Sequence, residues 1–355
     1  MDQENSMSIT VEDFGQLPDG RYVRRYRLTN RRGTIASFVD YGAAWMGFQR
    51  PEDTESLVLG CDTLEALLNQ TAFLGSTVGR YANRIANGQF ELDGKRLQVD
   101  QNEGRHHLHG GVENFTQTLW TVEEQQDIQN GVMIRFSHNS PSGNGGFPGN
   151  VQVSVDIRLT DDDRVEFRYR ASSDTKTVFG MTNHVYFNLD GRTAGSLENH
   201  EFCIPAQTVV DVDANAIPNG ELVEIKNTPL DLLNWTNVDA VLSQTNDSRL
   251  LRAGGFDHCF CYPNDNVLRQ VASAKSEMSN VQLTCSSNQP GLQFYSGNFL
   301  ANTPYGTNEN YQKYGGFCFE PGQWPDSPNQ PTFPNSVLEE GEVYDSVIIY
   351  EFSPC

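Results

Sequence analysis

The sequence predicts an all-β fold, a large antiparallel β-sandwich with a few short helices. Three observations support this prediction: apolar and polar residues alternate in several segments, turn-forming residues separate those segments, and helical periodicity is rare. A sandwich buries the apolar side of each alternating strand between two facing sheets. Large β-sandwiches often exceed the usual domain length, so we expect residues 1–355 to form a single domain.

Two hairpins and a C-terminal strand account for the clearest alternation. In the first hairpin, the apolar positions are Val153, Val155, Ile157 and Leu159. The aspartates of residues 161–163 then favour a turn, and residues 165–170 alternate again. Residues 90–99 predict a second hairpin, because their central Asp-Gly pair readily adopts the positive φ angles of a tight turn. Residues 346–352 are rich in β-forming side chains.

Helices and long loops are few. Residues 63–69 and 231–235 are the two candidates for short helices, and no alternation of strands with helices suggests a parallel sheet. The Ser, Gly and Asn residues of the stretch 139–150 predict a long surface loop.

The composition narrows the class of ligand. A formal net charge of −21 repels nucleic acid, anionic membranes and polyanionic substrates, so a neutral ligand fits best. No apolar run approaches the roughly 20 residues that span a bilayer. Residues 1–10 lack the basic start and apolar stretch of a secretory signal.

The seven cysteines are scattered and odd in number, as expected for free thiols in a reducing compartment. We therefore expect a cytoplasmic protein. Cys259 and Cys261 form a close pair that suggests a metal or redox element, but alternate positions on a strand explain the pair more simply.

Several stretches interrupt the alternation with polar groups, which need partners if they are buried. Residues 79–88 contain Arg80, Asn83 and Arg84. Either the arginines cap loops through backbone carbonyls, or they bind the hydroxyls of a sugar. The capping interpretation carries more weight for Arg80 than for Arg84.

Residues 106–111 contain three histidines before a Gly-Gly pair. On a strand, His107 and His109 would share one face. A metal site is the first interpretation of such a cluster, but no matching set of ligands follows at a known spacing. A structural role and a catalytic role therefore both stay open for His109.

Residues 182–189 place His184, Tyr186 and Asn188 on one face of a predicted strand. That face is either exposed to solvent or part of a half-apolar pocket in which an imidazole exchanges protons. Asp257 follows a glycine and a phenylalanine and, taken alone, is more typical of a turn than of a ligand-binding site.

Glu320 is the strongest candidate for a general base. It lies beside Phe319 and before a proline-rich loop, residues 321–329. An apolar wall raises the basicity of a carboxylate, and a restrained backbone fixes its direction. The competing interpretation is an exposed glutamate at a strand end.

Taken together, these stretches resemble the galactose mutarotase (aldose 1-epimerase) family, in the family's order from Gly79 to about Pro331, and most closely its enterobacterial-type members. The matching motifs are residues 79–85, 108–111, 183–189, 256–258 and 293–298 and the Glu320 segment. The resemblance implies a galactose mutarotase-like supersandwich. It also implies Glu320 as general base, His184 as general acid and His109 as a second catalytic histidine, with sugar-binding positions at Asn83, Arg84, Asp257 and Gln293. Residues 322–324 depart from the family pattern, which leaves the pocket rim and the sugar preference open.

The implied reaction interconverts the α and β anomers of free hexoses such as galactose and glucose, with no metal and no cofactor. We expect the base to be ionised and the acid protonated in the resting enzyme. A glucose-6-phosphate 1-epimerase is the nearest competing function, but it needs cationic groups, and no Arg/Lys cluster lies beside the motifs. A sugar-binding module without turnover and an inverting glycosidase that uses Asp257 and Glu320 are also compatible with these residues. The sequence does not determine the oligomeric state.

Overall fold

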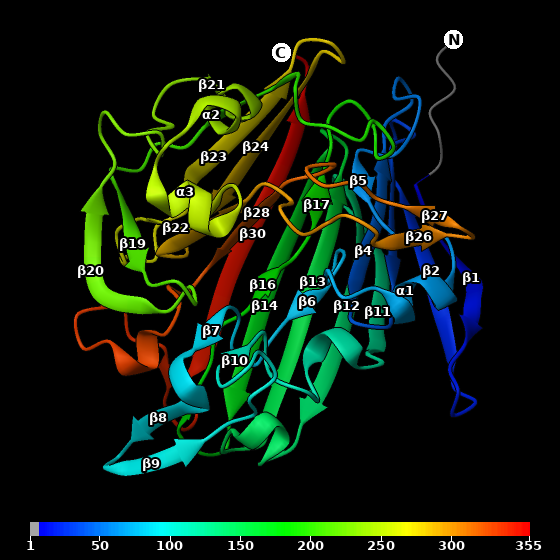
Figure 1. Cartoon of the computed structure of the whole chain (residues 1–355). Helices are drawn as coiled ribbons and strands as arrows, with labels where there is room; N and C mark the ends of the chain where they lie inside the picture. Colours follow the sequence, from blue (N-terminus) through cyan, green and yellow to red (C-terminus); the bar gives the residue numbers. More distant parts are fainter. Residues whose placement is uncertain (1–6) are drawn as a thin grey trace.

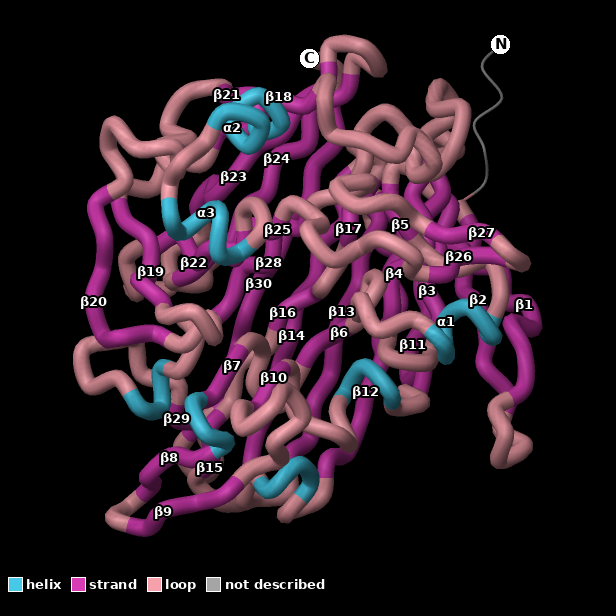
Figure 2. Tube along the Cα trace, in the orientation of Figure 1, coloured by secondary structure: helices cyan, strands magenta, loops and turns pink. Residues whose placement is uncertain are grey.

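The computed structural model describes residues 7–355, and most of its regular structure is β-strand (Figures 1 and 2). All sheets are antiparallel, as the sequence predicts. The expectation that no secretory signal is present concerns residues 1–10, of which residues 1–6 lie outside the described part. Within residues 7–355, no helix combines the length and the apolar character needed to cross a bilayer.

A nine-stranded sheet, which we call the central sheet, has β30 in its middle, between β14 and β24 (Figure 1). In spatial order its strands are β11 (Thr121–Ile128), β12 (Gly131–Ser140), β13 (Val151–Thr160), β14 (Arg164–Ser173), β30 (Val343–Ser353), β24 (Val281–Ser287), β23 (Arg269–Ser276), β18 (His200–Cys203) and β21 (Thr236–Asn237).

Two smaller sheets pack on the central sheet. One is ordered β1 (Ser8–Gln16), β2 (Tyr22–Thr29), β3 (Ile35–Val39) and β4 (Ala44–Gln49). The other is ordered β20 (Pro218–Glu224), β19 (Thr208–Val212), β22 (Asp257–Cys261), β25 (Gly291–Tyr295) and β28 (Cys318–Gly322). The remaining strands form short pairs: β5 (Val58–Leu59) with β17 (Tyr186–Phe187), β6 (Thr77–Val78) with β16 (Thr182–Asn183), β7 (Arg84–Ile85) with β10 (His107–Leu108), β8 (Gln89–Leu92) with β9 (Lys95–Gln98), β15 (Thr177–Val178) with β29 (Val337–Leu338), and β26 (Pro304–Gly306) with β27 (Glu309–Asn310).

Buried aromatic rings join the three sheets. Phe48 of β4 stacks on Phe352 of β30 with ring centroids 4.0 Å apart. Phe294 of β25 lies 5.0 Å from Phe202 of β18. The strand register places Phe202 and Phe352 on the same face of the nine-stranded sheet. These residues belong to one continuous cluster of buried apolar side chains, and each buried aromatic ring contributes a large apolar area. The β-sandwich prediction is confirmed, and the single domain stays a prediction that this shared core supports.

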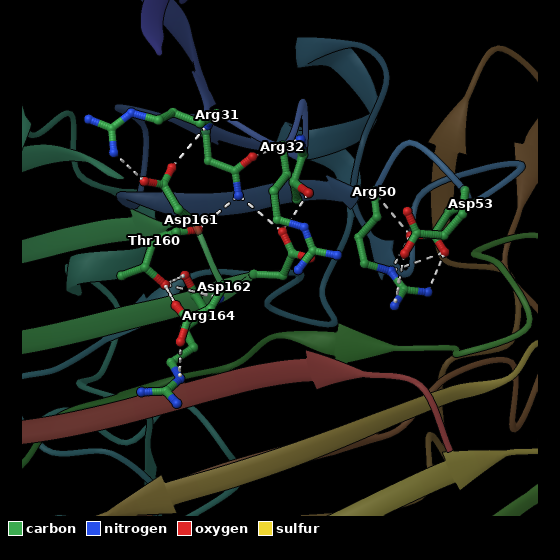
Figure 3. Close-up of polar contacts among 12 residues, drawn as sticks. Arg31, Arg32, Arg50, Asp53, Thr160, Asp161, Asp162 and Arg164 are labelled. Carbon is green, nitrogen blue, oxygen red and sulfur yellow. Dashed lines mark hydrogen bonds and ion pairs between the residues drawn. The ribbon is translucent and has the colours of Figure 1, made fainter. Parts of the chain in front are cut away.

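The predicted hairpins are present as β13–β14 and β8–β9, and the C-terminal strand as β30. The aspartates of the first turn also tie it to the loop between β2 and β3. Asp161 accepts from Arg31 at 2.8 Å, and Asp163 pairs with Arg32 at 3.0 Å (Figure 3). The turn therefore links the central sheet to the N-terminal sheet.

One of the two helix predictions is wrong. α1 (Leu64–Asn69) forms as expected, with the Thr63 hydroxyl capping its first turn. Residues 231–235 instead form an irregular segment with a bend at residues 233 and 234, where the carbonyl of Leu232 accepts from the backbone N–H of Ile204 at 2.7 Å. The other two α-helices of the described chain are α2 (Val238–Gln244) and α3 (Ser248–Ala253), neither of which the sequence pattern predicted.

The expected surface loop at 139–150 is partly wrong. β12 continues through Ser140, and Phe147 is fully buried. The loop packs around Arg80, whose guanidinium donates to the backbone carbonyls of Ser140, Pro141 and Pro148. Arg80 is therefore a buried loop cap, the interpretation that carried more weight for it.

Candidate active site

The seven site residues predicted from the sequence line one cavity of about 230 Å³, which we call the polar cavity. Its remaining lining comprises Thr71, Ala72, Phe73, Glu103, Leu108, Tyr186, Tyr295 and Phe299. The volume suits a molecule of monosaccharide size. The roles of these residues stay predictions, whereas their convergence from distant segments is a property of the fold.

Three adjacent strands supply one wall of the polar cavity. Gln293 of β25 lies opposite Glu320 of β28. The Gln293 amide donates to Asp257 of β22 at 2.6 Å and accepts from the Asn83 amide at 3.2 Å. Burial raises the pKa of Asp257, while the charge of Arg84 and the hydrogen bond from Gln293 oppose the rise. Asp257 therefore belongs to a polar network and not to an isolated turn.

Arg84, on the short strand β7, also lines the polar cavity. Its guanidinium pairs with Glu103 through bonds of 2.6 and 2.8 Å. Such a two-point contact fixes the plane of the guanidinium. Sequence reasoning missed Glu103, because nothing in its loop marks it as the partner of an arginine 19 residues away.

His109 leaves the strand that the sequence pattern assigned to it. β10 contains His107 and Leu108, whereas His109 follows with a positive φ of 50°. The two histidines therefore do not share a strand face: His107 packs on Phe147, and His109 faces the polar cavity. The next residue, Gly110, has a φ of 91°, and a Cβ there would lie 1.9 Å from the carbonyl oxygen of Gly79. Glycine is therefore required at this position.

The backbone N–H of Asn83 donates to Nδ1 of His109 at 3.1 Å. Nδ1 is thus an acceptor, and a neutral His109 carries its proton on Nε2. Burial, with smaller contributions from His184 and Arg84, holds the pKa of His109 well below its usual value. His109 is therefore a neutral imidazole with one N–H to offer.

Glu320 and His184 form the central pair of the polar cavity. Oε1 of Glu320 lies 3.6 Å from Nε2 of His184, and both side chains are buried. Burial, assisted by the charge of Asp257, raises the pKa of Glu320 well above its usual value. Burial also lowers the pKa of His184 to about 4. Burial disfavours both charges. The His184 pKa near 4 leaves its imidazole neutral at neutral pH, unlike the expected protonated acid, and the raised pKa of Glu320 shifts the carboxyl away from the expected ionised form.

The expected strand around His184 is broken. β16 ends at Asn183 and β17 begins at Tyr186, and the backbone N–H of His184 donates to the carbonyl of Ser76. His184 and Tyr186 line the polar cavity, as the pocket interpretation requires. Asn188 does not, because its amide donates to the carbonyls of Ser196 and Gly315.

Cys318 is a further neighbour of His184 that sequence reasoning missed. Its Sγ lies 3.7 Å from Nδ1 of His184. Potential ligand atoms of His184, Cys318 and Glu320 all lie within 4.8 Å of one another, a spacing that a metal ion would accept. However, burial raises the pKa of the Cys318 thiol well above its usual value, and metals bind the thiolate. The need for no metal stays a prediction.

The departure from the family pattern at residues 322–324 lies away from the polar cavity. Trp324 is buried and donates to the carbonyl of Pro290, and Gln323 lies in another surface depression, beside Ser336. These residues therefore do not form the rim.

The Cys259 and Cys261 pair occupies alternate positions of β22, and all seven cysteines are free within residues 7–355.

A larger cavity of about 740 Å³ adjoins the polar cavity and shares Arg84, Glu103, Asp257 and Phe299 with it. Arg105, Arg249 and Arg252 also line it, so an arginine cluster lies beside the site, contrary to the expectation from sequence. These arginines come from separate segments that the fold brings together. Acidic groups offset them, since Arg84 pairs with Glu103 and Arg249 pairs with Asp247 at 2.6 Å. Neither histidine of the polar cavity, nor Glu320, reaches this larger space.

Comparisons with known proteins identify the family of this chain. The family model described as aldose 1-epimerase matches residues 24–351. An aldose 1-epimerase of Escherichia coli K12 is 37% identical over 94% of this chain and 96% of its own length. A human galactose mutarotase is 36% identical over 98% and 99%. The crystal structure of a galactose 1-epimerase from Lactobacillus acidophilus superposes with a TM-score of 0.87, at 24% identity, over 98% of this chain and 99% of the other. With the family model and both relatives matching nearly the whole chain, this protein belongs to the aldose 1-epimerase family.

Proposed function

We propose that this enzyme interconverts the α and β anomers of free hexoses, galactose and glucose among them, through proton transfer by Glu320 and His184. One observation carries the proposal: a buried carboxyl and a buried imidazole lie 3.6 Å apart in a cavity of monosaccharide size. The family to which the chain belongs supports the reaction, and the geometry of this pair supports the assignment of roles.

Mutarotation needs one base and one acid. The C1 hydroxyl loses a proton to Glu320, and the C1–O5 bond breaks as the ring oxygen gains a proton from His184, which gives the free aldehyde. Rotation about the C1–C2 bond presents the other face of the aldehyde. The same two groups then act in reverse, and ring closure yields the opposite anomer.

Burial favours the neutral forms of both groups, which is compatible with these roles. A protonated carboxyl beside a neutral imidazole contains as many protons as a carboxylate beside an imidazolium. Transfer of one proton from Glu320 to His184 therefore creates the reactive form without exchange with solvent. Hydrogen bonds from the sugar hydroxyls stabilise the charges of that form.

The other polar residues orient the sugar. Arg84 and Asn83 offer N–H donors, while Asp257 and Gln293 add acceptors, so the lining can satisfy several hydroxyls at once. His109 donates from Nε2 to a sugar oxygen near the reacting centre, because its Nδ1 is already occupied by Asn83. This set of groups suits a neutral polyhydroxylated ligand.

Polarimetry is the direct test. Freshly dissolved α-galactose and α-glucose should reach rotational equilibrium faster with the purified protein than without it. A glycoside with a blocked C1 oxygen should stay unchanged, since ring opening requires a free hydroxyl. Hydrolysis of the glycoside, with no effect on free sugars, would instead favour an inverting glycosidase that uses Asp257 and Glu320.

We also propose a cytoplasmic location, which rests on the seven free thiols in residues 7–355. Fractionation of the native host would test it. Recovery of the protein outside the cytoplasm would contradict this proposal without affecting the proposed reaction.

A further inference from the structure

Phe73 contacts both histidines of the polar cavity, although its sequence context gave it no role. Its ring centroid lies 4.8 Å from that of His109 and 5.8 Å from that of His184. The two imidazoles are themselves 5.3 Å apart and nearly perpendicular, with an interplanar angle of 81°. Three rings therefore form one packed group at the edge of the cavity.

The backbone of Phe73 adopts a conformation that bulky residues rarely accept. Its φ is +57°, in the left-handed region. Such conformations cluster at functional sites, where the surrounding structure must hold them. Asn83 and His109, which also line the polar cavity, have φ angles of 67° and 50°.

The structure around Phe73 holds this conformation and directs the ring. The carbonyl of Phe73 accepts from the backbone N–H of Ser76 at 3.0 Å, which closes the turn. The N–H of Gly75 donates to the carbonyl of His184, also at 3.0 Å. Leu74 is fully buried and anchors the turn in the core. The loop of Phe73 is thus tied to the segment that carries His184.

We propose that Phe73 is a positioning residue for His184 and His109: its ring fixes the planes of both imidazoles and excludes water from them. The proposal rests on the proposed function, because it assumes that these histidines serve the reaction. A residue that merely filled space would support the fold without controlling how the histidines exchange protons.

Water exclusion has a measurable consequence. Burial is the main cause of the lowered pKa values of both histidines. Removing the ring admits water, which solvates the imidazolium and raises these pKa values. The titratable groups that also face the two imidazoles are Glu320, Cys318, Tyr186, Tyr295, Arg84 and His107. Truncating Phe73 alters none of these side chains.

The test compares Phe73→Ala, Phe73→Leu and Phe73→Tyr by mutarotation kinetics and by NMR titration of the histidine rings. For Phe73→Ala we expect kcat to fall about 10- to 100-fold, with KM changed far less, because misplaced reacting groups cost this much. The pKa of His184 should rise from about 4 towards 6.5. Phe73→Tyr should restore most of both properties, and Phe73→Leu should give an intermediate result. The matched control is Phe14→Ala. Phe14 lies on β1, its phenyl ring is half-buried, and the guanidinium of Arg25 lies over that ring.

Unchanged histidine pKa values in a folded Phe73→Ala protein would overturn the proposal, even with a reduced kcat. A raised KM with a native kcat would overturn it as well, since Phe73 would then contact the sugar directly. If the alanine variant fails to fold, the leucine and tyrosine variants provide the same two readouts. The NMR titration needs no turnover, so it separates failure of this proposal from failure of the proposed function.

Discussion

Replacing Glu320 by glutamine should separate the chemistry of the pair from its packing. Glutamine has nearly the same shape, but it cannot take a proton from the C1 hydroxyl. A positioned general base contributes about 10²- to 10⁴-fold to a rate, or roughly 3–5 kcal/mol of barrier, and kcat should fall by that factor. KM should change less, because the hydroxyl-binding groups stay in place.

The same substitution should stabilise the folded protein at high pH. Within residues 7–355, no hydrogen bond to the Glu320 carboxylate is found, and an ionisable neighbour, His184, lies 3.6 Å away. Its folded pKa is raised, so the stability it contributes is present below its unfolded value near 4.5 and is lost as pH rises through the folded pKa. Glutamine does not titrate. The variant should therefore gain about 1–3 kcal/mol over the native protein at pH 8, the usual cost of an unpaired buried polar group, and little at pH 4.

Polarimetry and denaturant unfolding at pH 4 and pH 8 measure both effects. A folded Glu320→Gln protein with near-native mutarotation would refute the mechanism, although the family assignment would survive. Equal stability gains at the two pH values would refute the link between burial and the raised pKa.

The site supports four further expectations. His184→Asn should reduce kcat by about 10²- to 10⁴-fold through loss of the acid, whereas Cys259→Ser, at a side chain that does not line the polar cavity, should stay within a few-fold of the native rate. The value of kcat/KM should decrease below about pH 4, where His184 becomes protonated, and again above the raised pKa of Glu320. A kcat/KM that stays constant from pH 3 to 5 would contradict the assignment. Dialysis against EDTA should leave the rate unchanged, and loss that a divalent metal restores would indicate a centre at His184, Cys318 and Glu320. The kcat/KM values for galactose 6-phosphate and glucose 6-phosphate should be roughly tenfold or more below those for the free sugars. The reason is that Glu103 and Asp247 already neutralise two of the nearby arginines. A higher kcat/KM for either phosphate would favour the sugar-phosphate epimerase.

Individual strands could be predicted where the alternation of apolar and polar residues in the sequence matches the buried and exposed faces of the strand. The alternation of Val153 to Leu159 predicted β13, because one face of that strand is buried in the sandwich. The failure at residues 231–235 has a long-range cause: the Leu232 carbonyl accepts from the backbone N–H of Ile204 and is therefore not left for a helix. Hydrophobic periodicity does not detect such pairing with a distant segment.

The site residues could be named from their motifs, but their partners could not. Asn83 and Gln293 are 210 residues apart in the chain and share a hydrogen bond. The arginines beside the polar cavity arise in the same way, since Arg105 precedes Arg249 by a long stretch and both line one space. Pairings of this kind depend on sheet order, which alternation does not determine.

The protonation state of the central pair could not be predicted, because it depends on depth and not on residue type. At ordinary pKa values the carboxyl is ionised at neutral pH and the imidazole is partly protonated. Burial shifts both groups towards their neutral forms, with the His184 pKa near 4 and the Glu320 pKa raised. This shift suits a reaction that must run in both directions. Because the two groups share one proton, Glu320 can act as the base and His184 as the acid when the ring opens, and their roles reverse when it closes.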